Sequence, residues 1–134
     1  MKDLIVKTSK RTQFVDITDQ IADIVSESGL KDGIVAVFVP HTTAGITINE
    51  NADPDVVTDI TSVLDKAVPW SDGYRHSEGN SAAHVKASLM GSSVSVIVRN
   101  GSLRLGTWQS IYFCEFDGPR TRKVFINLSS SHGE

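Results

Sequence analysis

The 134-residue sequence predicts an α+β fold, a single domain with a largely antiparallel β-sheet or sandwich and about three helices. Three observations support this prediction. Several short segments are rich in Val, Ile, Thr and aromatic residues, three segments have apolar residues at helical spacing, and turn sequences separate the predicted strands. The length fits one domain over residues 1–134, with a polar tail from about residue 129.

The first half of the chain predicts four strands, in segments 2–9, 11–18, 33–40 and 44–51. The first two surround a short polar turn, and the fourth alternates apolar and polar side chains. Segment 33–40 is almost continuously apolar, which favours a strand buried on both faces.

Three helices are predicted, in segments 18–29, 52–69 and 80–91. Thr18 is expected to cap the first helix, which Gly29 ends. Asp53 is a good cap for the second helix, whose apolar stripe is formed by Val57, Ile60, Val63 and Leu64. Asn80 or Ser81 is expected to cap the third.

Strands joined mostly by hairpins complete the predicted sheet. Segment 92–99 is followed by Asn100-Gly101, a strong signal for a two-residue hairpin turn. Asp117-Gly118-Pro119 is the predicted turn between strands 106–116 and 122–128.

Composition excludes several classes of protein. A net charge of −3 does not favour nonspecific nucleic-acid binding, and no apolar run approaches the roughly 18 residues of a membrane-spanning helix. The start of the chain lacks the apolar stretch of a signal peptide. Cys114 is the only cysteine, which excludes an internal disulfide and, with its apolar neighbours, predicts an inert core thiol in a cytoplasmic protein.

Three histidines of the folded part could share one metal ion. His76 lies in a loop and His84 about one turn into the third predicted helix, while His41 follows a predicted strand; His132 lies in the polar tail. Neutral imidazoles bind zinc, and catalytic zinc sites often have three protein ligands. The spacing is not a specific signature, and each histidine could instead be a half-buried hydrogen-bonding residue.

Polar side chains gather at the starts of the second and third predicted helices, where free amide groups and the positive helix end favour anions. The candidate anion-binding residues there are Asn49, Glu50, Asn51, Asp53, Asn80 and Ser81. Capping alone would explain Asp53 and Asn80. It does not explain Asn49, Glu50 and Asn51, which directly follow the apolar face of a strand.

Other candidates are weaker. Thr107 and Gln109 continue an apolar strand face and could line the rim of a pocket or lie on an edge strand. Lys86 could bind a phosphate or be a solvated surface charge. The sequence contains no GxSxG, GxGxxG or GxxxxGK[ST] motif, so nucleophilic catalysis and nucleotide binding through those loops are not supported.

Three blocks of the sequence resemble the YjbQ-like family, which is labelled secondary thiamine-phosphate synthase. They are HTTAGITINENADPDV, YRHSEGNSAAHVKASLMG and SVSVIVRNGSLRLGTWQSIYFCEFDGPR. The third block is the most specific, and the similarity covers nearly the whole chain. The resemblance implies a compact α+β homotrimer with a pocket for a metal ion or an anion near the histidine motifs.

By motif match, the resemblance carries the metal-ligand role to His41, His76 and His84, and pocket roles to residues of both helix starts. Glu50 and Glu78, carried over as pocket residues, are our candidate catalytic carboxylates. The label implies joining a pyrimidine diphosphate to a thiazole phosphate with release of pyrophosphate. Three histidines favour a zinc-like ion, whereas such a reaction commonly uses the oxygen-preferring magnesium.

Three functions remain open at this point. The first is a small metal-using enzyme that acts on a phosphorylated substrate, with thiamine-phosphate synthesis as the named case. The second is a metal-dependent hydrolase in which Glu50 or Glu78 is the base for a metal-activated water. The third is a non-catalytic trimeric protein that binds a small anionic metabolite, with no nucleic acid or membrane as partner.

Overall fold

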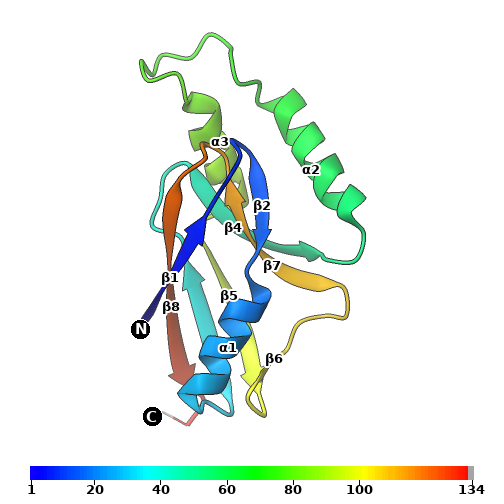
Figure 1. Ribbon diagram of the computed structural model, residues 1–134, viewed down its shortest axis with the longest axis vertical. Helices are drawn as coiled ribbons and strands as arrows, with labels where there is room; N and C mark the ends of the chain where they lie inside the picture. The colour runs from blue at the N-terminus through cyan, green and yellow to red at the C-terminus, as the bar shows by residue number, and fades with distance from the viewer. Residues whose placement is uncertain (133–134) are drawn as a thin grey trace.

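The computed structural model describes residues 1–132, which form two antiparallel sheets and three helices (Figure 1). The strands are β1 (Lys2–Lys7), β2 (Gln13–Asp16), β3 (Gly33–Phe38), β4 (Ala44–Glu50), β5 (Ser93–Arg99), β6 (Ser102–Leu103), β7 (Gln109–Glu115) and β8 (Thr121–Ser130). The helices are α1 (Thr18–Ser28), α2 (Pro54–Ala67) and α3 (Ser81–Met90).

One sheet has the strand order β1-β8-β3-β5-β6 and the other β2-β7-β4. Every strand pair is antiparallel, which confirms the predicted α+β fold. The predicted hairpin joins β5 to β6, and Asn100 and Gly101 both have the positive φ that its turn needs.

The expectation that hairpins join most strands was wrong. The turns after β1, β3 and β7 lead into the other sheet, so the Asp117-Gly118-Pro119 turn connects β7 to β8 across the sandwich. Short turns look alike in sequence whether the next strand pairs with the previous one or lies in the facing layer.

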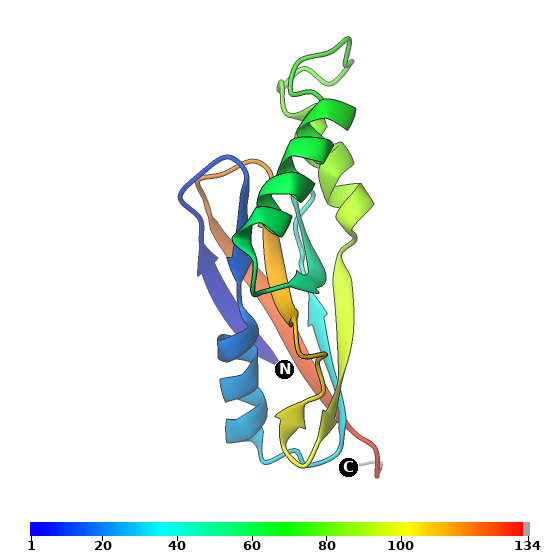
Figure 2. The ribbon, with the colours of Figure 1, turned by 90° about the vertical axis from the view of Figure 1, so that its right-hand side faces the viewer.

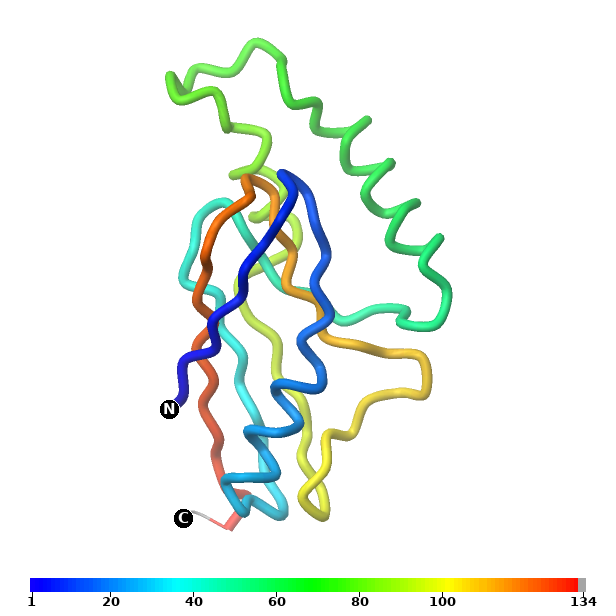
Figure 3. The backbone as a smooth tube through the Cα atoms, viewed as in Figure 1, coloured from blue at the N-terminus to red at the C-terminus, as the bar shows by residue number. Residues whose placement is uncertain are grey.

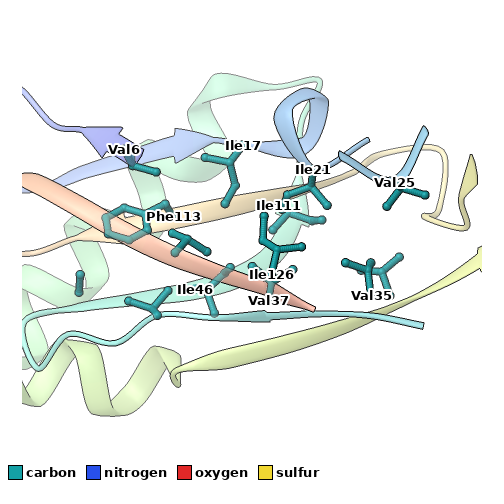
Figure 4. Packing of buried hydrophobic residues seen from close by; sticks show 14 of the residues in the cluster. Val6, Ile17, Ile21, Val25, Val35, Val37, Ile46, Ile111, Phe113 and Ile126 are labelled. Atoms are coloured by element: carbon teal, nitrogen blue, oxygen red, sulfur yellow. The ribbon is translucent and has the colours of Figure 1, made fainter. Parts of the chain in front are cut away.

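The main core lies between the two sheets, and α1 contributes to it (Figure 4). Its fully buried side chains include Ile17, Ile21, Val25, Val35, Val37, Ile46, Ile111, Phe113 and Ile126. Each such side chain contributes about 1.5–3 kcal/mol through the hydrophobic effect. This shared core fixes the ends of β3 and β4, from which the loop carrying His41 extends.

β7, and not β3, is buried on both faces. Six of the seven β7 residues are buried, because the main core lies on one side and a second cluster with α3 on the other. β3 instead alternates, with Ile34 and Phe38 exposed by 47% and 45%. The outward face of its sheet is apolar but uncovered in a single chain, which explains the wrong prediction.

The start of α1 differs from the prediction. The helix begins at Thr18 with Ile17 in the N-cap position, and the Asp16 carboxylate accepts a hydrogen bond from the Thr18 N–H at 3.0 Å. The Thr18 hydroxyl instead accepts from the Ile111 N–H at 2.8 Å, which ties α1 to β7. Gly29 ends the helix in a left-handed conformation, as predicted.

α2 begins as predicted but packs loosely. The Asp53 carboxylate accepts a hydrogen bond from the Asp55 N–H at 2.9 Å. Val57 and Leu64 pack against the second cluster, whereas Val63 is 64% exposed and no α2 residue is fully buried. The predicted apolar stripe is therefore divided between the protein body and the solvent.

The loop that joins α2 to α3 projects past the ends of both sheets (Figures 1 and 2). At the other end of the chain, β8 continues to Ser130, so the first residues of the predicted polar tail pair with β3. The last two residues of that tail lie outside the described part. No helix in residues 1–132 is long and apolar enough to cross a membrane.

Candidate functional site

The site begins with the close packing of α3 on β4. A Cβ atom at Gly45 would lie 2.8 Å from the Gly91 carbonyl oxygen and 2.9 Å from the Met90 Cβ, so this approach requires glycine. The Ile46 N–H donates to the same Gly91 carbonyl at 3.1 Å. The contact brings α3, with His84, next to the loop that follows β3.

A hollow of about 490 Å³, the histidine pocket, opens between this loop and α3. Its lining residues are His41, Thr42, Ala44, His84, Ala87, Ser88, Gly91 and Ser92. Two imidazoles and three hydroxyl groups can therefore meet a ligand there. The structure thus brings together His41 and His84, which are 43 positions apart in the chain, as their sequence motifs predicted.

A second hollow, of about 410 Å³, lies at the start of α3 and includes Arg75, His76, Ser81 and His84. The rings of His76 and His84 meet edge to face, with centroids 5.3 Å apart. The Glu78 carboxylate lies 3.7 Å from His76 Nε2. His84 therefore lines both hollows, and in the second its ring meets His76, which in turn lies beside the Glu78 carboxylate.

His41 is held by a backbone hydrogen bond. Its Nε2 accepts from the Lys123 N–H at 3.0 Å, which places the proton of the neutral ring on Nδ1. Burial, followed by the nearby Arg122 charge, lowers the pKa of His41 below its ordinary value. The lowered pKa favours the neutral ring, in which Nδ1–H is the remaining donor.

These residues fit a metal ion in part. Two imidazoles bound tetrahedrally to one zinc ion have ring centroids about 5 Å apart, which agrees with the His76–His84 separation of 5.3 Å. His41 does not fit as a third ligand, because its Nε2 already accepts a hydrogen bond. Within residues 1–132, no three His, Cys, Asp or Glu side chains are grouped to hold an ion.

The other predicted polar residues form a separate group, the amide cluster, at the far end of β4. Its members are Asn49, Glu50, Asn51, Asp53, Thr107 and Gln109. The Asn51 N–H donates to the Trp108 carbonyl at 2.8 Å, and its Nδ2 donates to the Gln109 carbonyl at 3.2 Å. The segment that follows β4 therefore lies beside the start of β7, on the side of the molecule where the 104–108 loop lies (Figure 3).

Local hydrogen bonds account for the polar side chains that capping alone did not explain. The Asn49 Oδ1 accepts from the Glu50 N–H at 2.7 Å, and the Glu50 carboxylate accepts from the Ala52 N–H at 3.1 Å. These bonds shape the turn that leads from β4 into α2. Substrate binding by the amide cluster remains a prediction beside this structural role.

The amide cluster is distant from the histidines of the same chain. His41 precedes β4 and Glu50 ends it, and the six residue steps from Ala44 to Glu50 span about 20 Å of extended strand. A small ligand in the histidine pocket therefore cannot also contact Glu50 of that chain. Glu78 is the predicted catalytic carboxylate that lies beside the histidines.

The remaining predicted residues lie on α3 or at its N-cap position. Asn80 occupies the N-cap position without a capping bond: its Nδ2 donates to Asp117 at 2.9 Å, and its buried Oδ1, which would accept from a helix amide, has no hydrogen-bond partner in the described part of the chain. Ser81 lines the second hollow. The Lys86 ammonium is almost fully buried and lies 2.5 Å from the Asp65 carboxylate, where it ties α3 to α2.

A buried polar network behind His41 was missed in the sequence. Glu115 and Arg122 form an ion pair, and Thr8 and Thr43 bond to it. Burial alone would raise the pKa of Glu115, but hydrogen bonds from Arg122, a backbone amide and Thr8 lower it below its ordinary value. The signal was a glutamate within the apolar run IYFCEF. Its neighbour Cys114 is buried as predicted, which raises the pKa of the thiol.

Comparison with known proteins places these features in a family. A family model described as "UPF0047 protein YjbQ-like" matches residues 2–131. The UPF0047 protein YugU of Bacillus subtilis is 54% identical over 129 residues, which cover 96% of this chain and 98% of that protein. The UPF0047 protein MJ1081 of Methanocaldococcus jannaschii is 53% identical over 92% of this chain and 89% of its own length.

Solved structures show the same fold. A crystal structure of an uncharacterized conserved protein of the YjbQ/UPF0047 group from Clostridium acetobutylicum has a TM-score of 0.94 and 60% identity. The alignment covers 96% of this chain and 100% of that chain. A protein of unknown function from Sulfolobus solfataricus has a TM-score of 0.92 and 36% identity, with 97% and 96% covered.

Proposed function

Because the chain belongs to the YjbQ-like UPF0047 family, we propose that it is a small metal-using enzyme that acts on a phosphorylated substrate. The observation that carries this proposal is the pair His76 and His84, whose ring centroids lie 5.3 Å apart where two hollows meet. A zinc-like divalent ion suits these imidazoles, with magnesium as the alternative if diphosphate oxygens supply most of its ligands.

The chain's own residues supply the other contacts. His41 Nδ1–H donates to a phosphate oxygen in the histidine pocket, where Ser88 and Ser92 add hydroxyl groups. Arg75 brings a positive charge to the second hollow. The Glu78 carboxylate lies 3.7 Å from His76 Nε2, close enough to move into a hydrogen bond that would orient this ring when a metal ion binds, as carboxylates commonly do for metal-binding histidines.

The family label names one reaction that this arrangement could serve, the synthesis of thiamine phosphate. A carbon–nitrogen bond forms between the pyrimidine and thiazole parts while the carbon–oxygen bond to the diphosphate breaks. A divalent ion at His76 and His84 would balance the charge of the departing diphosphate. The donors of His41 and Arg75 hold phosphate oxygens of the substrates while that bond breaks.

Zinc binding by single variants tests the proposed site. His76→Ala and His84→Ala should each lower the affinity for zinc by more than about 100-fold, because each removes a direct ligand. His132→Ala is the matched control, since His132 lies near the exposed end of the chain. Calorimetric titration of zinc into chelator-treated protein gives the affinities, and circular dichroism confirms the fold.

Equal zinc affinity in the wild type and both variants would contradict the metal site. His41→Ala should retain zinc and lose affinity for inorganic phosphate, because its ring serves as a donor. A three-histidine ion site predicts instead that His41→Ala loses zinc as the other two variants do. Release of pyrophosphate from the two thiamine precursors then tests the named reaction.

A metal-dependent hydrolase is the second candidate, favoured by the position of Glu78 beside His76. Glu78 would take a proton from the attacking water. Turnover of phosphate monoesters, esters or lactones by the zinc-loaded protein, lost in Glu78→Gln, would favour this function over the synthase. A bound anionic metabolite without turnover would favour a binding protein.

We also propose that the protein is a cytoplasmic homotrimer. The outward face of the five-stranded sheet supports an assembly, because Ile34, Phe38 and Ile97 are all about half exposed on it. Covering this face with other copies would bury the side chains that made segment 33–40 look fully buried. Sedimentation equilibrium should give three times the chain mass, and a stable monomer would contradict the trimer.

A further inference from the structure

We propose that the buried Glu115–Arg122 pair acts as a positioning device that fixes His41 as an Nδ1–H donor in the histidine pocket. This inference rests on the proposed role of the pocket. It assigns a function to residues that touch neither hollow. It is supported by a set of hydrogen bonds that holds the His41 loop at Thr43 and holds β8 at Arg122, next to the Lys123 N–H that bonds to His41.

The first connection runs through the loop that carries His41. An Arg122 guanidinium nitrogen donates to the Thr43 hydroxyl at 2.9 Å, only two residues after His41. The Thr43 carbonyl in turn accepts from the Phe116 N–H at 3.2 Å, next to Glu115. The loop is therefore held at Thr43 by Arg122 and by the backbone of the residue that follows Glu115.

The second connection runs through β8. Lys123, whose N–H donates to His41 Nε2 at 3.0 Å, directly follows Arg122. The position of that N–H therefore depends on where Arg122 is held. Arg122 Nε donates to Glu115 at 2.8 Å, and a second guanidinium nitrogen contacts the other carboxylate oxygen. One ion pair thus positions both the loop that carries the acceptor, His41 Nε2, and the strand that carries the donor, the Lys123 N–H.

Joining the two sheets does not by itself require charges. Glu115 is fully buried and Arg122 is 4% exposed, so both charges lose their hydration. Apolar residues of similar volume often replace such a pair with no loss of stability. A guanidinium, however, can bond a carboxylate and a hydroxyl in fixed directions, which apolar side chains cannot. The His41 loop needs hydrogen bonds in fixed directions, because they hold the ring against the Lys123 N–H.

The consequence concerns the chemistry of the pocket. An unrestrained neutral imidazole exchanges its proton between the two nitrogens, so it presents a donor or an acceptor. Holding the Lys123 N–H against Nε2 leaves a donor at Nδ1. That tautomer suits a phosphate oxygen. It also explains why His41, unlike His76 and His84, does not contribute a free nitrogen for a metal ion.

Two buried threonines provide a matched test. Thr43 and Thr8 are 6% and 8% exposed, and the hydroxyl of each bonds to one member of the pair. Thr43 adjoins the His41 loop, whereas Thr8 follows β1. Thr43→Val should make the Nδ1–H form of His41 the minority tautomer. Thr8→Val and Thr43→Ser should leave it dominant.

Two-dimensional ¹⁵N–¹H correlation of the imidazoles at about pH 8, above the ordinary histidine pKa of about 6.5, measures the tautomer directly. Affinity for inorganic phosphate should fall about tenfold in Thr43→Val and remain unchanged in Thr8→Val. If Thr43→Val does not fold, Arg122→Lys carries the same test. A lysine can pair with Glu115 but lacks the second branch that reaches Thr43.

An unchanged tautomer in Thr43→Val or Arg122→Lys would overturn the proposal. An equal change in Thr8→Val would also overturn it, because the pair would then act only as a general structural link. The tautomer readout needs no metal ion. A failure of zinc binding in the earlier experiment would therefore leave this result interpretable, and the two proposals can fail separately.

Discussion

The two ends of β4 use polar side chains in different ways. At the Glu50 end, neighbouring residues form hydrogen bonds with one another: side-chain oxygens accept from backbone amides one or two residues away. At the Ala44 end, the polar residues come from distant parts of the chain and surround two hollows. Polar residues that are close in sequence here form a turn, and those that are far apart form the candidate site.

The ends also differ in what lies behind them. A buried ion pair and two threonines hold the loop at the histidine end, whereas the amide cluster rests on backbone bonds to Trp108 and Gln109. Substitutions behind the histidine end should therefore affect both stability and ligand binding. Substitutions in the amide cluster should affect stability and leave zinc binding at the histidines unchanged.

The largest expected effect is on the stability of Glu115→Gln. Removing one charge leaves Arg122 buried without its partner, which should lower the free energy of unfolding at pH 7 by about 3–5 kcal/mol. Urea denaturation measures this loss. Replacing both residues together, Glu115→Leu with Arg122→Met, should restore much of the stability because no charge is left buried alone.

The same variant has a predictable pH dependence. The pKa of Glu115 is lower in the folded state than in the unfolded state. The stabilisation that its carboxylate gives the folded protein is therefore fully present above the unfolded-state pKa of about 4.3, and it is lost as the pH falls through the folded-state pKa. The wild type should lose stability below about pH 4.3, and Glu115→Gln should lack this part of the loss. The difference in unfolding free energy between the wild type and Glu115→Gln should therefore become smaller in acid. A gap that widens would contradict the assigned pKa.

A smaller effect is expected at the other end of β4. Asp53→Ala removes the cap of α2 and should cost about 1 kcal/mol of stability, measured by thermal denaturation. Asp53→Ser keeps a capping oxygen and should cost less. Both should bind zinc with wild-type affinity, because the amide cluster lies about 20 Å from the histidines along β4. A tenfold loss of zinc affinity would mean that this end does contribute to the site.

The sequence predicted most elements because their boundaries depend on local chemistry. Asp53, Gly29 and Asn100-Gly101 act within a few residues, and all three behave as expected. The two-face burial of β7 rather than β3 was not predictable, because it depends on where α3 packs. An apolar segment alone does not show whether the same chain covers it.

The histidines show the same limit. The motifs suggested His41, His76 and His84, but spacing could not show that two of them form a close pair while the third bonds to β8. Arg122 and Glu115 lie on strands of different sheets. Their pairing follows from the packing of the two layers, and the residues between them do not indicate it.

Anomalous X-ray scattering at the zinc absorption edge, from crystals of zinc-loaded protein, tests the proposed metal site at His76 and His84 most directly. We expect a peak about 2.0–2.1 Å from nitrogens of both His76 and His84, with His41 Nε2 still bonded to the Lys123 N–H. A peak bound by the carboxylates of the amide cluster, or no peak at the two histidines, would contradict it.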